Sequence, residues 1–222
     1  MKLTHPSILK IIDTDNKKIN SVIIENQRFF SELCMDIYNQ CLGYDGETVI
    51  SIGDSPIDIG KYTELITQFV PFELNKKTLL NKVTAMANKL SVDPDYYEST
   101  MGELASIEKY LWNIVENLEG NISFSKLSME NIIKSIGLQF EDQYDCLGEK
   151  IIDYLELVRF YDRDKLFIFV NLRSFIDDKE AYELYDSLLR KSFNVIMIEN
   201  TEYELLANEE RLIIDSELCE IC

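Results

Sequence analysis

Four lysines lie in a stretch of the sequence that has no acidic residue. The stretch is 74–92, LNKKTLLNKVTAMANKLSV, and it holds Lys76, Lys77, Lys82 and Lys89. Lysine ammonium groups bind phosphate oxygens, and such contacts give nucleic-acid binding without sequence preference. The chain as a whole opposes this chemistry, because its formal net charge is −18 and a polyanion repels a polyanion. The sequence therefore predicts a basic zone on an acidic body. The alternative for each lysine is an ordinary solvated helix face.

The loop GDSPIDIGKYT, residues 53–63, follows a predicted strand and has features of a phosphate-binding loop. A P-loop needs four residues between its glycines and a Ser or Thr directly after its lysine. Here six residues separate Gly53 from Gly60, a tyrosine follows Lys61, and two aspartates in the loop would repel a phosphate. We favour a strand-to-helix turn without a nucleotide. The rival is a nucleotide hydrolase that uses this loop together with Glu199.

Carboxylates are abundant, since the chain has 40 Asp and Glu residues. Calcium takes several carboxylate and carbonyl oxygens, but no EF-hand loop occurs in the sequence. Glu116, Asn117 and Glu119 end one predicted helix, and Glu130 lies near the start of the next. These side chains are placed to converge on a cation across the connection EGNISFSKLS; a solvated helix end is the alternative. No acid pair stands out as catalytic, so we predict no catalytic residue.

Cysteine and histidine chemistry is sparse. The single histidine, His5, excludes a site built from several histidines, and the odd, scattered set of five cysteines indicates free thiols. Cys219 and Cys222 form a CxxC, but no second pair completes a zinc site. No apolar run reaches the ~18 residues of a membrane span, and the start MKLTHPSILKIIDTD is charged too early for a signal peptide. We expect a cytoplasmic protein without a membrane partner.

The elements that must position these residues alternate between strand and helix in the outer thirds of the chain. Four short apolar runs predict strands covered on both faces: 21–25, 48–54, 165–171 and 193–199. Helical patterns lie between them, at 26–42, 148–161 and 177–191. Asp177 or Asp178 can cap the start of the last of these helices. The predicted fold class is α/β, with a mainly parallel sheet flanked by helices.

The middle of the chain is different. From Lys61 to Phe160 the patterns indicate helices and no convincing strand, namely 74–90, 99–118 and a third helix that opens at SMEN and closes at Gly137. Ser128 is a suitable N-cap for the third. We therefore predict a head made of residues 1–70 and 139–222, interrupted by a helical lobe at 71–138.

Aromatic residues in the lobe are open to two interpretations, base stacking and core packing. Trp112, Val115 and Leu118 share helical spacing with Ile107 and Leu111. Such a face is typical of a buried helix surface. We predict core packing.

Three stretches in this order resemble a known family. They are SMENIIKSIGLQFE (128–141), KLFIFVNLRSFI (165–176) and NVIMIENTEYEL (194–205), within a split α/β head that carries a helical insertion. The chain is similar along essentially its whole length to the type II-A CRISPR-associated spacer-acquisition proteins, the Csn-two family. None of the three stretches is a catalytic signature.

The resemblance implies a function that resides in an assembly. In the family, four subunits form a ring that threads onto free ends of double-stranded DNA, calcium stabilises the arrangement, and the P-loop-like head has a degenerate nucleotide site without nuclease activity. Other adaptation proteins of the type II-A system are the implied partners. Through the match at MENIIKSIG, the resemblance implies a metal-region acid at Glu130 and a basic residue near the hole of the ring at Lys134, and less directly metal-region acids at Glu116 and Glu119. The candidates are then Lys76, Lys77, Lys82, Lys89, Lys126 and Lys134 for DNA, and Glu116, Glu119 and Glu130 for calcium.

The predicted function is sequence-independent binding of DNA ends by a homotetramer in spacer acquisition, without catalysis. A ring can place lysines inside and acids outside, which reconciles a net charge of −18 with a DNA partner. Two alternatives remain open: the nucleotide hydrolase, and a protein scaffold that has no affinity for DNA.

Overall fold

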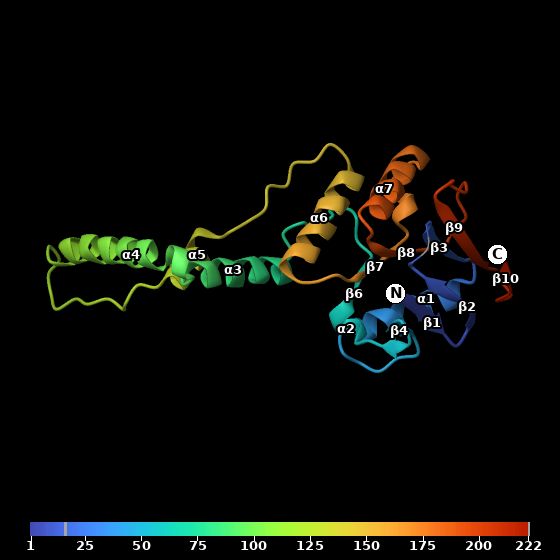
Figure 1. The fold of residues 1–222 in the computed structure, drawn as a ribbon, viewed down its shortest axis with the longest axis horizontal. Coiled ribbons are helices and arrows are strands. Elements are labelled where there is room, and N and C mark those ends of the chain that lie inside the picture. The colour runs from blue at the N-terminus through green and yellow to red at the C-terminus, as the bar shows by residue number, and fades with distance from the viewer. Residues whose placement is uncertain (16, 222) are drawn as a thin grey trace. The chain divides into compact units, whose positions relative to one another are not determined.

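The computed structural model describes residues 1–15 and 17–221. The chain divides into two compact units. The first, made of residues 1–73 and 143–222, is the α/β unit; the second, residues 74–142, is the helical unit. Figure 1 shows the chain leaving the α/β unit after β6 and returning to it at α6.

A mainly parallel sheet organises the α/β unit, as predicted. Its strand order is β10-β9-β3-β8-β7-β6. The strands are β3 (Ile19–Ile24), β6 (Thr63–Ile66), β7 (Leu166–Val170), β8 (Asn194–Glu199), β9 (Glu209–Ile214) and β10 (Glu220–Ile221). All neighbours pair in parallel except β10 with β9. Every residue of β3 and β7 is buried. This explains the continuous apolar run of β7, whereas β3 also buries Asn20 and Ser21.

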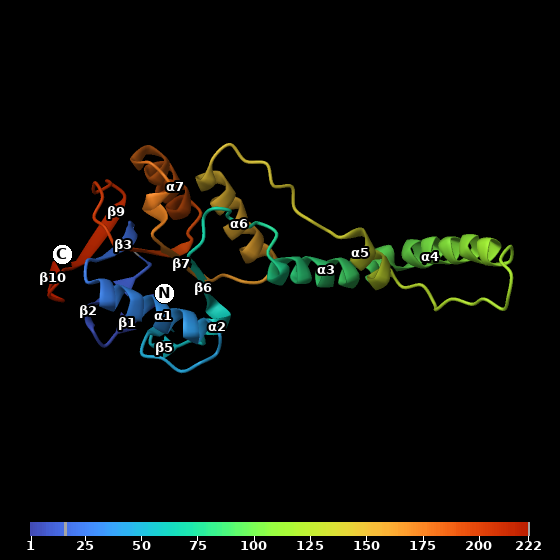
Figure 2. The same cartoon turned by 180° about the vertical axis from the view of Figure 1, so that it is seen from behind.

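Helices cover both faces of this sheet. They are α1 (Gln27–Cys41), α6 (Leu147–Tyr161) and α7 (Asp178–Arg190), with a single turn, α2 (Ile59–Tyr62), and a 3-10 turn at Leu172–Ser174. Figures 1 and 2 show α6 and α7 side by side, with β7 and β8 between them and α1. On the α1 side, Leu33 and Ile37 pack in one cluster with apolar residues of β3, β8 and β9. On the other side, Tyr154 and Tyr185 are fully buried.

Two strand predictions are wrong. Residues 48–54 do not join the parallel sheet: β4 (Val49–Ile52) pairs antiparallel with β1 (Lys2–His5) in a second sheet of order β2-β1-β4-β5, which also holds β2 (Ile8–Asp13) and β5 (Ser55–Pro56). Ile50 is buried whereas Val49, on the opposite face, is exposed, as expected of a strand with one covered face. The supposedly strand-free middle also contains β6, a short edge strand.

Helix ends follow the sequence signals. The side chain of Ser128 accepts a hydrogen bond from the Asn131 amide at 3.3 Å, and α5 (Met129–Ile136) ends at Gly137 with φ of 65°. A left-handed cap of this kind favours glycine. In the same way, Asp177 accepts a hydrogen bond from the Glu180 amide at 2.8 Å and begins α7. These two predictions are confirmed.

The helical unit contains α3 (Lys77–Ser91), α4 (Pro94–Val115) and α5. Asn75 joins its two ends: the side-chain amide donates to the Phe140 carbonyl at 3.0 Å, and the Phe140 amide donates back at 2.8 Å. Each helix buries one side chain: Leu79 in α3, Leu104 in α4 and Ile133 in α5.

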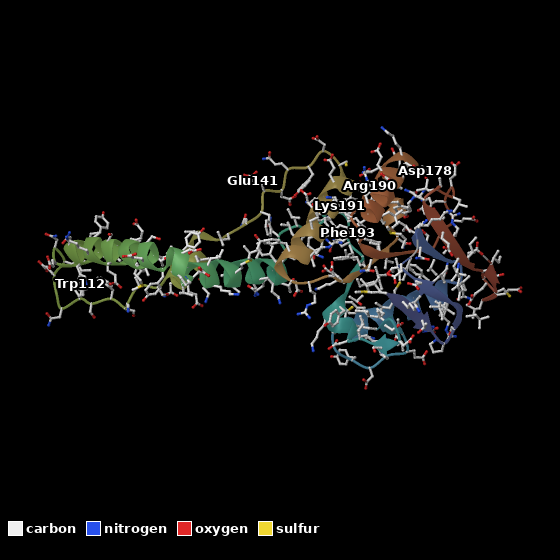
Figure 3. The ribbon with its side chains drawn as sticks, viewed as in Figure 1. Trp112, Glu141, Asp178, Arg190, Lys191 and Phe193 are labelled. Carbon is white, nitrogen blue, oxygen red and sulfur yellow. The ribbon has the colours of Figure 1, made fainter. Side chains whose placement is uncertain are left out.

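The predicted core face of residues 99–118, which lie in α4 and the turn that follows it, is not buried. Trp112 is 45% exposed, Leu118 52% and Ile107 39%. Trp112 packs against the ring of Phe124, with 4.7 Å between centroids, and this contact leaves much of the indole uncovered; Figure 3 labels Trp112 on α4. Helical spacing identifies a face that needs a cover, but it does not identify the molecule that provides it.

Among the described residues, no helix is both long and apolar enough to cross a membrane.

Candidate nucleic-acid interface

Helix α3 carries the lysines of the acid-free stretch. Lys77, Lys82 and Lys89 lie within it and are exposed, whereas Lys76 is its N-cap residue and is half-buried. Lys82 and Lys89 are seven residues apart and therefore lie on the same side of the helix, two turns from each other. Thus one side of α3 presents two exposed ammonium groups, two helical turns apart, and each can contact a phosphate.

The other two candidate lysines lie later in the helical unit. Lys126 is exposed in the connection before α5, and Lys134 is 61% exposed on α5. The Lys134 ammonium donates to the Glu130 carboxylate at 2.6 Å, one helical turn away. This hydrogen bond lowers the pKa of Glu130. Part of the Lys134 charge is therefore compensated within its own helix.

The candidate calcium ligands are all exposed. Glu116 is the C-cap residue of α4, Glu119 lies in the turn that follows, and Glu130 is the partner of Lys134. In the part of the chain that the structure describes, no three His, Cys, Asp or Glu side chains gather closely enough to hold a metal ion. A calcium site made with these acids needs further oxygens, and it stays a prediction. Of the CxxC, Cys219 is an exposed thiol, and Cys222 lies outside the described residues.

The loop 53–63 does not form a phosphate cradle. It runs through the β4–β5 hairpin into α2, whose N-cap is Asp58. The Asp58 carboxylate accepts a hydrogen bond from the Lys61 amide at 3.3 Å and lies 3.4 Å from the Lys61 ammonium. The groups that would bind a phosphate are thus already occupied by a negative side chain. Glu199, the other residue of the hydrolase hypothesis, lies on β8 in the other sheet.

A buried ionic network is the feature that sequence reasoning missed. The Arg173 side chain is 2% exposed and lies 3.8 Å from the Glu209 carboxylate. Its backbone amide donates to Glu199 at 3.1 Å, and its guanidinium also pairs with Asp178. Burial raises the pKa of Glu199 to about 7. The network joins the turn after β7 to α7, β8 and β9, so its contacts are structural.

Comparisons with known proteins identify the family. The sequence model of the Cas_Csn2 family, described as CRISPR-associated protein, matches residues 43–218. A CRISPR-associated protein Csn2 of Enterococcus faecalis is 21% identical over 205 residues, which cover 90% of this chain and 89% of that protein. A Csn2 protein of Streptococcus agalactiae is 23% identical over 199 residues, 86% of each chain.

A solved structure shares the fold. The crystal structure of Stu0660 of Streptococcus thermophilus superposes with a TM-score of 0.55 at 14% identity, covering 95% of this chain and 74% of the other. At this identity the likeness concerns the fold alone. Together with the family match over most of the sequence, it agrees with the resemblance carried by the stretches at 128–141, 165–176 and 194–205. The chain belongs to the Csn2 family of CRISPR-associated proteins.

Proposed function

We propose that this CRISPR-associated protein binds the free ends of double-stranded DNA without sequence preference. In the proposal it acts in the cytoplasm, in spacer acquisition, together with other adaptation proteins of the type II-A system, and it performs no catalysis. The observation that carries the proposal is the exposed, acid-free lysine surface of α3 on a chain of net charge −18. Positive charge gathered on one helix of so acidic a chain favours a polyanionic partner.

The chemistry of the surface supports a backbone contact rather than a base contact. Lysine is a point charge on a flexible stem, which suits phosphate oxygens of any sequence.

A single helical unit offers few contacts, so the proposal includes a homotetrameric ring. Exposed apolar side chains on α4 and in the turn after it support assembly, because apolar side chains that no element covers mark interaction surfaces. They include Ile107, Trp112 and Leu118. Four copies multiply the phosphate contacts of each lysine. Calcium held by Glu116, Glu119 and Glu130 together with acids of a second copy would reduce the repulsion between acidic subunits.

The test combines binding with solution mass. Two linear duplexes of unrelated sequence are titrated with the protein at several salt concentrations, with calcium and with chelator, and the mass is measured by sedimentation. We expect equal affinities for the two sequences, a log affinity that falls linearly with log salt, a tetramer, and tighter binding with calcium. Absence of binding to both duplexes would overturn the proposal and favour the scaffold, while magnesium-dependent ATP turnover that disappears on Lys61→Ala would favour the hydrolase.

A further inference from the structure

A groove in the α/β unit lies between α6 and α7, and none of the DNA or calcium candidates is among its lining residues. Its volume is about 530 Å³, within the ~300–1,000 Å³ of typical ligand sites. Ile152 of α6 and Leu184 of α7, both buried, provide apolar lining, with Tyr144 and Tyr182 beside them. Figure 3 marks α7 by Asp178 near its start and Arg190 near its end.

Carboxylates surround this apolar lining. The acids that line the groove are Glu149, Asp153, Glu180, Glu183 and Asp186, against a single arginine, Arg190. Arg190 is committed to Asp186, with 3.1 Å between Nε and the carboxylate. Lys179 lies 3.8 Å from Glu183, a pair that is exposed and therefore weak. The groove therefore keeps a negative excess, contributed mainly by Glu149, Asp153 and Glu180.

The neighbouring thiol reports the same negative potential. Cys146, which also lines the groove, is exposed. Burial raises the pKa of its thiol, and the carboxylates of Glu180 and Glu149 raise it further. The carboxylates thus disfavour a further anion in the groove, such as the Cys146 thiolate, and they favour a bound cation.

The distribution of the acids argues for an extended cation rather than a metal ion. They come from both helices, and among the described residues no three of them gather to hold a metal. A lysine- and arginine-rich segment matches such a spread, because each ammonium or guanidinium can meet a different carboxylate. The apolar lining between the acids suits an aliphatic side chain of the same segment.

We infer that the α6–α7 groove docks a short basic segment, with one apolar anchor residue, of a different protein. The chain itself is a poor source of this segment. Its acid-free basic stretch, 74–92, is folded as α3 with Leu79 buried, so it is not available as an extended ligand. The net charge of −18 would also speed the encounter with a basic partner.

The test uses the full-length protein and a short fluorescent peptide with about six Lys and Arg and one Leu, a charge count matched to the groove. We expect saturable binding that weakens about tenfold or more in Glu149→Lys with Asp153→Lys. The matched control, Glu204→Lys with Glu217→Lys, makes the same charge change at exposed positions outside the groove and should change affinity less than about twofold. The peptide without leucine should bind more weakly.

A second readout does not depend on variants that fold. Bound peptide should protect Cys146 from alkylation in the natural protein, while Cys219, exposed on the same unit, stays reactive. Any of three results would overturn the inference. Both double variants lose affinity equally, spermidine displaces the labelled peptide as well as the unlabelled peptide does, or Cys146 stays reactive with the peptide bound. A change of oligomer mass in the groove variant alone would overturn it as well, since it would assign the groove to a second copy. DNA binding should be the same in the groove variant and its control. A failure of the peptide-docking inference is therefore distinct from a failure of the proposed DNA binding.

Discussion

Lys82→Glu together with Lys89→Glu is expected to weaken the binding of double-stranded DNA by about tenfold or more at moderate salt. Both side chains are exposed on the same side of α3, and in every subunit of the proposed ring two attractive charges would become repulsive ones. The slope of log affinity against log salt should become shallower by about 0.9 for each phosphate that the protein no longer neutralises. The weakening should be uniform across unrelated sequences, because phosphates carry no base information. Fluorescence anisotropy at several salt concentrations measures both quantities.

The matched control for this pair is Lys17→Glu with Lys18→Glu. These two lysines are exposed on the α/β unit and make the same change in net charge. If the two double variants weaken binding equally, the effect reflects the total charge, and α3 is not the contact surface. Unchanged binding in the α3 variant would remove Lys82 and Lys89 from the interface.

Arg173→Met is expected to destabilise the α/β unit by about 1–3 kcal/mol, the usual cost of removing one polar partner from a buried network. The guanidinium is 2% exposed and lies 3.8 Å from Glu209, which also pairs with Arg211 at 3.3 Å. Met removes one of the two cations of this buried carboxylate and the partner of Asp178. Arg28→Met is the control: Arg28 pairs with Glu32 at 2.7 Å but is 88% exposed, so its removal should not measurably change stability. Urea unfolding of both variants at pH 8 gives the comparison.

The cost of Arg173→Met should also depend on pH. Burial raises the folded-state pKa of Glu199 to about 7, above the ~4.3 of a solvated Glu. The folded state therefore holds a proton that the unfolded state has released, and stability falls as pH rises from about 4.5 to 7. Without Arg173 the carboxyl pKa rises further, so the deficit relative to the natural protein should grow between pH 6 and pH 8. A deficit below about 1 kcal/mol at pH 8, or one independent of pH, would mean that Arg173 does not compensate buried charge.

Elements whose stability is local were predictable from the sequence. The apolar runs at 165–171 and 193–199 became buried parallel strands, and the caps at Ser128, Gly137 and Asp177 formed as expected. These signals depend on residues adjacent in the chain. β1 and β2 were missed because one face of each is covered and the other is not, a weaker pattern that a register shift near His5 disturbs further.

Contacts between distant residues could not be predicted. Arg173 meets Glu199 across 26 positions, and nothing in either local sequence identifies the other. The α4 face shows a different limit: its period was correct, but Trp112 is half-exposed in one chain, because periodicity does not distinguish an intramolecular cover from a partner. The candidate lysines were found because a charge pattern is visible without a fold, whereas the pairing of Lys134 with Glu130 at 2.6 Å required the helix.

The most direct test of the central claim compares linear and covalently closed circular duplexes of equal length and sequence, with calcium present, in one gel-shift series. A ring that encircles DNA from a free end predicts that the protein binds the linear form and that the circle is not bound until a cut restores an end. Equal binding to both forms would contradict the ring and would assign the lysines of α3 to an open surface groove.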